Sequence, residues 1–67
     1  MQNNVEKMRK LRDLSQEQLG EALGVSRQTI ISIEKGKYNP SLDLAFRMAL
    51  FFETPIEEIF IYGEELR

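Results

Sequence analysis

The stretch QEQLGEALGVSRQTIISIE, residues 16–34, decides the fold of this 67-residue chain. Leu19 and Leu23 lie four residues apart, so a helix would place both side chains on one face. Ile30 and Ile33 lie three residues apart and would share one face of a second helix. The stretch therefore predicts two short amphipathic helices whose apolar faces are buried.

The residues between these two helices predict a tight corner. Gly24 can adopt the left-handed conformation that ends a helix, Val25 can bury its side chain, and Ser26 can cap the helix that follows. Gly20 is unusual, because glycine inside a helix costs about 0.5–1 kcal/mol relative to alanine. We expect the next helix to cross closely over it. This pattern is typical of a helix-turn-helix, which reads DNA with its second helix.

Capping residues elsewhere predict three more helices and no strands, and therefore an all-α, compact five-helix fold. The expected helices span about residues 4–12, 16–23, 27–35, 42–52 and 55–60. Their capping side chains are, in the same order, Asn3 or Asn4, Ser15, Ser26, Ser41 and Thr54. Ser15 and Gln18 have the spacing of a capping box, and Pro55 suits the first position of the last helix. We expect one domain over residues 1–67, with the motif at about 16–35 and a C-terminal helix and tail at about 55–67.

The composition excludes most catalytic and metal-binding chemistry. The chain has no cysteine and no histidine, so it lacks the usual zinc ligands and the usual general base at neutral pH. We expect no enzyme activity, no metal, no cofactor and no small-molecule ligand. No apolar run approaches the roughly 20 residues that span a bilayer, and MQNNVEKMRK at the start lacks the apolar core of a signal peptide. We expect a cytoplasmic protein without a membrane partner.

Charge is distributed unevenly along the chain. The net charge is −2, but residues 1–52 carry eight Lys and Arg against six Asp and Glu, a balance of +2. Residues 53–67 carry one Arg against five Glu, a balance of −4. The acidic groups gather at one end and leave a mildly basic remainder, which by itself does not predict a nucleic-acid partner.

Three linked pieces of the sequence resemble one family of DNA-binding domains. They are NNVEKMRKLRDLSQEQLGEALGVSRQTI at residues 3–30, IEKGKYNPSLDLA at residues 33–45 and TPIEEIF at residues 54–60. Their order and spacing resemble the lambda-repressor/Cro-like helix-turn-helix family, also called the XRE family. The resemblance covers residue 4 to about residue 60 and implies a compact five-helix DNA-binding domain.

The resemblance implies which residues contact double-stranded DNA. The helix expected over residues 27–35 corresponds to the recognition helix, whose N-terminal end enters the major groove. The family's base-reading positions fall on Arg27, Gln28 and Ser32. Arg27 can form a bidentate contact with guanine, and Gln28 can do the same with adenine. Contacts to the DNA backbone are expected from Gln16, Thr29, Lys35, Lys37, Tyr38 and Asn39.

Some of these residues also have a plainer explanation. Outside this motif, Arg27, Gln28 and Ser32 would simply be polar residues on a solvated helix face. Tyr38 could pack its ring on the domain and expose only its hydroxyl. Ile31 departs from the polar pattern of its face; it can contact a thymine methyl group or be shielded by the neighbouring loop, and we favour the second explanation.

The resemblance further implies an ion pair between Arg9 and Glu34. In the family, an arginine of the first helix pairs with a glutamate that ends the third helix. We expect this pair to be partly buried and to have a structural role, since it would orient the recognition helix.

Apolar residues near the C-terminus exceed what a small core requires, and we expect them to form a homodimer interface. The expected interface residues are Phe51, Phe60, Ile61, Tyr62 and Leu66, with Leu50 beside them. Two copies related by a twofold axis could read the half-sites of a palindromic operator, about one helical turn apart. The alternative is that the tail folds back onto its own domain.

The sequence therefore predicts a homodimeric transcriptional regulator that binds double-stranded DNA sequence-specifically. Repression by covering promoter DNA is expected, because 67 residues hold no separate effector domain. The alternative is an antitoxin or adaptor module whose main partner is another protein. Arg27, Gln28 and Lys35 favour DNA, since an adaptor has no obvious use for them.

Overall fold

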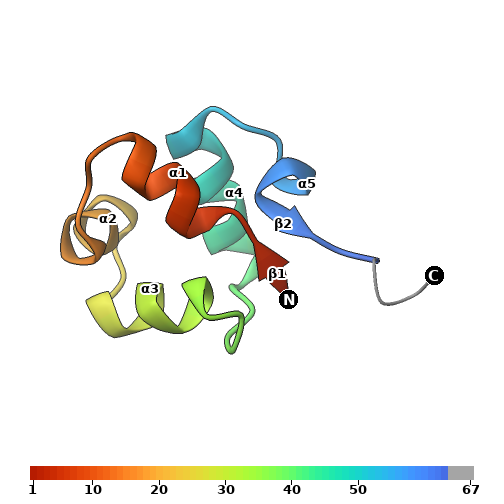
Figure 1. The fold of residues 1–67 in the computed structure, drawn as a ribbon, viewed down its shortest axis with the longest axis horizontal. Helices are drawn as coiled ribbons and strands as arrows, with labels where there is room; N and C mark the ends of the chain where they lie inside the picture. The colour runs from red at the N-terminus through yellow and green to blue at the C-terminus, as the bar shows by residue number, and fades with distance from the viewer. Residues whose placement is uncertain (64–67) are drawn as a thin grey trace.

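The computed structural model describes residues 1–63 and contains five helices and one small sheet (Figure 1). The helices are α1 (Val5–Leu11), α2 (Gln16–Leu23), α3 (Arg27–Glu34), α4 (Leu42–Phe52) and α5 (Ile56–Ile59). The strands are β1 (Gln2–Asn3) and β2 (Phe60–Ile61). The predicted five-helix fold is confirmed. Within residues 1–63, no helix has the length and apolar character needed to cross a membrane.

The corner between α2 and α3 forms as its residues predict. The Ser15 hydroxyl accepts from the backbone N–H of Gln18 at 3.0 Å, and the Gln18 side chain accepts from the backbone N–H of Ser15 at 2.8 Å. This capping box starts α2, and Gly24 ends it in the left-handed conformation at φ 75°. The Ser26 hydroxyl then accepts from the backbone N–H of Thr29 at 3.1 Å and starts α3. Local capping therefore sets both ends of the corner.

Gly20 lies where the backbone of the turn comes closest to α2. A Cβ atom at this position would lie 2.7 Å from the carbonyl oxygen of Val25 and 3.3 Å from backbone atoms of Ser26. The expected close approach is real, but the expectation that the next helix makes it is wrong. The turn itself covers Gly20, because α3 begins only after Ser26.

An arginine of α4 supports the same corner from outside. Arg47 donates through Nη1 to the carbonyl oxygen of Leu23, one of the last carbonyls of α2. Asp43, one helical turn earlier on α4, lies 3.0 Å from Nε of Arg47. Carbonyls at a helix end lack intrahelical partners, so Arg47 satisfies one that the turn would otherwise leave open.

The hydrophobic core draws on every helix. Leu19, Ile30, Ile33 and Met48 have no exposed surface. The whole core cluster consists of Val5, Leu19, Leu23, Ile30, Ile33, Leu44, Ala45, Met48, Phe52, Ile59 and Phe60. Burial on α4 follows the helical spacing of its apolar residues.

Two local expectations near the ends of the chain are wrong. The chain has strands: Gln2 pairs with Ile61 and Asn3 with Phe60 in an antiparallel register. The last helix spans residues 56–59 instead of about 55–60, and Thr54 does not cap it, because its hydroxyl donates to the carbonyl oxygen of Phe52 at 2.9 Å. The chain leaves α5 at Phe60 in an extended conformation, with φ −112° and ψ 125°, and pairs there with β1.

We expect Gly20→Ala to lower the free energy of unfolding by about 1–3 kcal/mol, the usual cost of overpacking a tight site. The gain of about 0.5–1 kcal/mol that alanine normally gives in a helix is smaller than this cost. Urea titration measures the difference, with Glu21→Ala, an exposed position of the same helix, as the control. A midpoint for Gly20→Ala equal to or above that of the unchanged protein would contradict this explanation.

Candidate nucleic-acid interface

Helix α3 presents a polar face outward and an apolar face inward. Ile30 and Ile33 are fully buried, whereas Arg27 and Gln28 are exposed and Ser32 is half-buried. The buried pair fixes the rotation of the helix about its axis. The three residues predicted to read bases therefore lie on the side of α3 that solvent reaches.

Several of the predicted DNA-contacting residues line one shallow hollow. Its lining consists of Ser26, Gln28, Thr29, Ser32 and Tyr38. The hydroxyls of Ser26 and Thr29 lie 3.0 Å apart and share a hydrogen bond. Two predicted base readers thus meet two predicted backbone contacts in one place, while Arg27 lies outside the hollow.

The remaining predicted backbone contacts follow α3 in a tight turn. Gly36, at φ 75°, donates to the carbonyl oxygen of Ile33 at 2.9 Å. Lys37 donates through its backbone N–H to the carbonyl oxygen of Ser32 at 3.0 Å. These two bonds form a Schellman motif. The turn is thus attached to the helix, and the exposed side chains of Lys35, Lys37, Tyr38 and Asn39 leave from it.

Arg9 and Glu34 form an ion pair that joins α1 to the end of α3. The guanidinium donates through Nε to Oε2 at 2.6 Å and through Nη2 to Oε1 at 3.2 Å. It also donates through Nη1 to the carbonyl oxygen of Leu14 at 2.8 Å. The side chains of Arg9 and Glu34 are only 10% and 4% exposed. The hydrogen bond to Glu34 raises the pKa of Arg9, against an opposing effect of burial, so the guanidinium stays charged.

Gln16 belongs to the same network, which the sequence did not indicate. Its amide donates to Oε1 of Glu34 at 3.1 Å, so one carboxylate holds the start of α2, the end of α3 and α1 together. An amide nitrogen carries two N–H groups, and the first N–H groups of a helix lack intrahelical partners. Gln16 therefore still has donors that could reach a phosphate.

The expected dimer residues lie in different environments. Phe60 is only 7% exposed and belongs to the core of its own chain, but it also lines the apolar hollow near α5, so its place in an interface stays a prediction. Phe51 and Ile61 are half-buried, and Tyr62 is exposed. The Phe51 ring also contacts the ring of Phe52, with centroids 5.2 Å apart. Leu66 lies outside the described residues.

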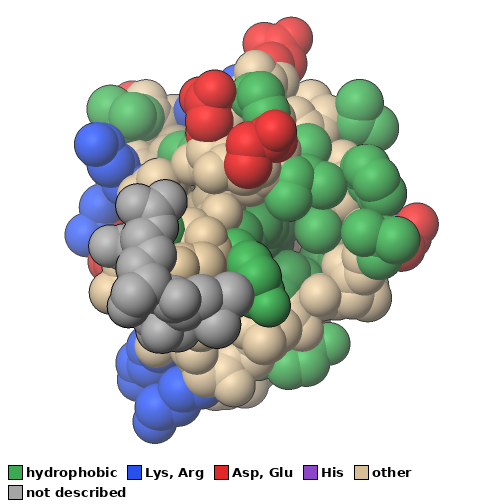
Figure 2. All heavy atoms as spheres, turned by 90° about the vertical axis from the view of Figure 1, so that its right-hand side faces the viewer, with side chains coloured by type: hydrophobic (Ala, Val, Ile, Leu, Met, Phe, Trp, Pro, Cys, Tyr) green, Lys and Arg blue, Asp and Glu red, His purple; other side chains and the backbone are tan. Residues whose placement is uncertain are grey.

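An apolar hollow that the sequence did not indicate lies on the side of α4, α5 and β2. Its apolar lining comes from Met1, Pro40, Leu42, Ala45, Ile56, Phe60 and Tyr62. Figure 2 shows hydrophobic side chains around a hollow on this side, with acidic side chains above it and basic ones at the lower and left edges. Leu42 and Tyr62 are 71% and 75% exposed, so the rim is a large apolar surface that residues 1–63 leave uncovered.

Ile31 is half-buried on the outer side of α3 and does not belong to the core cluster. It is also absent from the group of partly buried residues that pack against that cluster. Core packing therefore does not account for an apolar residue at this position, and its shielding by the neighbouring loop stays a prediction.

Removal of Arg9 should be far more harmful than removal of its neighbour Lys10. Arg9→Ala leaves the buried carboxylate of Glu34 without its partner, and such a loss costs about 3–5 kcal/mol. Lys10→Ala removes only an exposed pair with Glu6, at 3.1 Å, and exposed helical pairs contribute about 0.3–0.5 kcal/mol. Equal midpoints of the two variants in urea titrations would reject the structural role of Arg9.

The chain resembles known DNA-binding regulators in sequence and in fold. A family model described as helix-turn-helix matches residues 5–59. An uncharacterised HTH-type transcriptional regulator of Methanocaldococcus jannaschii is 58% identical over 65 residues, which cover 97% of this chain and 98% of the relative. The crystal structure of the restriction-modification controller protein C.AhdI from Aeromonas hydrophila matches with a TM-score of 0.75 and 28% identity, over 85% of this chain and 86% of that one.

More distant relatives include both a repressor and an activator of transcription. The cryptic phage CTXphi transcriptional repressor RstR of Vibrio cholerae is 33% identical over 85% of this chain and 51% of its own length. The transcriptional activator BcrR of Enterococcus faecalis is 42% identical over 91% of this chain and 31% of its own length. Together with the family model and the fold, these relatives show that the chain belongs to the XRE-type helix-turn-helix family of transcriptional regulators.

Proposed function

We propose that this protein regulates transcription by binding operator DNA, with α3 in the major groove. The observation that carries the proposal is the polar outer face of α3, held rigidly by the buried Ile30 and Ile33. Arg27 and Gln28 offer the two side-chain types best suited to bidentate contacts with guanine and adenine. Ser32 lies one turn further along the same helix and offers a hydroxyl to either kind of base edge.

Contacts to phosphates would position this helix on the duplex. The exposed turn after α3 supplies Lys35, Lys37, Tyr38 and Asn39, and the starts of α2 and α3 supply Gln16 and Thr29. Lysine contacts to phosphates add affinity without sequence information. The mildly basic balance of residues 1–52 supports this division, because the excess of acidic over basic groups lies in residues 53–67. Since the proposed partner is chromosomal DNA, the proposed location of the protein is the cytoplasm of a bacterial or archaeal cell.

The proposed active form is a homodimer on a palindromic operator. One recognition helix spans only a few base pairs, and a twofold dimer reads two half-sites one turn of DNA apart. The apolar hollow near α5 supports a second copy as its occupant, since Leu42, Phe46, Leu50 and Tyr62 expose large side chains on α4 and beyond β2. In Figure 1, α5 and β2 lie beyond the C-terminal end of α3, so a partner there would leave the N-terminal end of α3 accessible.

Repression is the proposed outcome of binding. A protein seated on promoter DNA excludes polymerase without any further activity, and the related RstR is a repressor. The related BcrR is an activator, so transcription from a promoter that carries the operator must be measured with and without the protein. A fall in transcript supports repression, and a rise replaces it with activation.

Selection from a random DNA library should yield a palindromic motif. Gln28→Ala should lose preference at one base position in each half-site, at a cost of about 1–3 kcal/mol for the matched base. Lys37→Ala should weaken binding to all sequences alike and reduce the salt dependence, the slope of log K against log salt, by about one. Binding titrations at several salt concentrations measure both effects.

The two variants control for each other, because one should alter sequence preference and the other salt dependence. Binding that is weak, insensitive to salt and indifferent to Gln28→Ala would contradict the proposal. It would favour the alternative of an adaptor or antitoxin whose main partner is a protein.

Light scattering at micromolar concentration should give twice the protomer mass of 7.8 kDa. Tyr62→Asp should shift the protein toward the single protomer, because a charge is costly in an apolar interface. Leu11→Asp is the matched control, since Leu11 is 76% exposed and Tyr62 is 75% exposed, but Leu11 lies on α1. A 7.8 kDa species alone in the unchanged protein would count against the dimer.

A further inference from the structure

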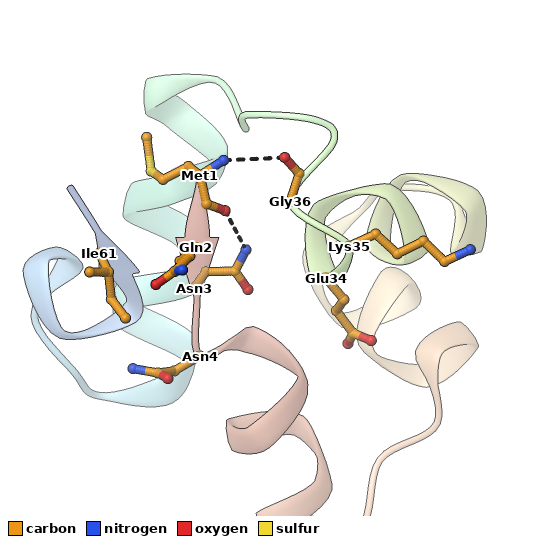
Figure 3. Close-up of a pocket in the computed structure, with 8 residues that line it drawn as sticks. All are labelled: Met1, Gln2, Asn3, Asn4, Glu34, Lys35, Gly36 and Ile61. Atoms are coloured by element: carbon orange, nitrogen blue, oxygen red, sulfur yellow. Dashed lines mark hydrogen bonds between the residues drawn. The ribbon is translucent and has the colours of Figure 1, made fainter. Parts of the chain in front are cut away.

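Asn3 uses both ends of its side-chain amide to connect separate parts of the fold. Its Oδ1 accepts from the backbone N–H of Val5 at 3.1 Å, at the start of α1. Its Nδ2 donates to the carbonyl oxygen of Ile33 at 2.8 Å, near the end of α3. Nδ2 also lies 3.3 Å from the carbonyl oxygen of Met1. Figure 3 shows this side chain between β1 and the end of α3.

The carbonyl oxygen of Ile33 is the point where this connection meets the turn after α3. The same oxygen accepts from the backbone N–H of Gly36 at 2.9 Å, one of the two bonds of the Schellman motif. A carbonyl oxygen can accept two hydrogen bonds, so Asn3 and the turn share one atom. The turn carries Lys35 and Lys37, and in Figure 3 the Lys35 side chain points away from β1.

The other side of β1 is held by the C-terminal part of the chain. Asn3 pairs with Phe60 in the sheet. The backbone N–H of Asn4 donates to the carbonyl oxygen of Ile59 at 2.8 Å, and the Asn4 side chain donates to the carbonyl oxygen of Glu58 at 3.0 Å. The backbone around Asn3 is therefore fixed by α5 and β2, and the Asn3 side chain can hold the end of α3 in place.

We propose that Asn3 is a positioning residue for DNA binding. It fixes the C-terminal end of α3 and the turn at residues 35–37, so that Lys35 and Lys37 face the phosphates when the start of α3 lies in the groove. The inference rests on the proposed function, and it adds a residue that contacts no DNA. The N-terminal end of α3 has its own support from the Ser26 cap, so Asn3 acts on phosphate contacts and leaves base preference to Arg27 and Gln28.

Asn3→Ser separates the bond that Asn3 accepts from Val5 from the bonds that it donates to Ile33 and Met1. A serine hydroxyl can still accept from the N–H two residues later, but it is too short to reach the carbonyl oxygen of Ile33. Asn4→Ser is the matched control, because Asn4 is the same residue type one position along and its side chain bonds α5 instead of α3. Neither substitution changes the net charge.

Operator binding of both variants is measured across a range of salt concentrations, at a temperature where circular dichroism shows each one folded. We expect the slope of log K against log salt to be less steep for Asn3→Ser by about one to two, since each lost phosphate contact removes about 0.9 from it. We expect Asn4→Ser to keep the slope of the unchanged protein. Base preference should stay the same in both.

A second comparison tests whether Asn3 acts through the turn. Lys37→Ala should reduce the slope in the unchanged protein but have little further effect in the Asn3→Ser background. Equal reductions in the two backgrounds, or an unchanged slope for Asn3→Ser, would overturn the inference. If Asn3→Ser does not fold, Asn3→Asp keeps the acceptor for Val5 and loses the donor, with Asn4→Asp as the control for the added charge.

Hydrogen exchange on the free protein keeps this test separate from the proposed function. The backbone amides of Gly36 and Lys37 should exchange faster in Asn3→Ser than in Asn4→Ser, while the capped amide of Leu44 should not change. Faster exchange without any salt-dependent DNA binding by the unchanged protein means that the proposed function fails. Unchanged exchange, with DNA binding intact, means that the role of Asn3 fails alone.

Discussion

The close contact between Gly20 and the turn that follows α2 is the constraint on which the rest of the fold depends. A hydrogen atom at Gly20 allows the carbonyl of Val25 to approach to a distance that a methyl group would forbid. The contact sets the angle at which α3 leaves the corner. Ile30 and Ile33 then enter the core, and the polar face of α3 turns outward. Close packing at this corner therefore helps to direct the polar face of α3 toward solvent, together with the ion pair at the end of the helix.

Elements whose ends depend on nearby residues could be predicted from the sequence. The spans of α2 and α4 match the predicted ones, because Ser15 and Ser41 cap them and the apolar spacing continues to the last turn. The pairing of β1 with β2 could not be predicted in this way. It joins residues from opposite ends of the chain, and two-residue strands have no alternation to read. The predicted capping of the last helix by Thr54 was wrong for a related reason, since its hydroxyl donates to the carbonyl of Phe52 on α4.

Part of the candidate site could be predicted, and part depended on three-dimensional contacts. Gln28 and Ser32 lie on the solvent side of α3 because helical spacing places them opposite Ile30 and Ile33. The bond from Gln16 to Glu34 links two helices, and only the fold brings these side chains within 3.1 Å. The burial of Phe60 in the core could not be predicted, because apolar residues near a chain end can serve the core as well as a partner, and their spacing does not distinguish the two roles.

Internal hydrogen bonds of α3 are concentrated away from its proposed reading edge. The carboxylate of Glu34 and the carbonyl of Ile33 bind α1, α2 and β1. Among residues 1–63, by contrast, no hydrogen bond or ion pair involves the side chain of Arg27 or Gln28. Substitutions at these two positions remove no hydrogen bond or ion pair of the described residues, so under the proposed function operator preference could change by single codon changes without loss of such bonds. One architecture can in this way diversify into many regulators within a genome.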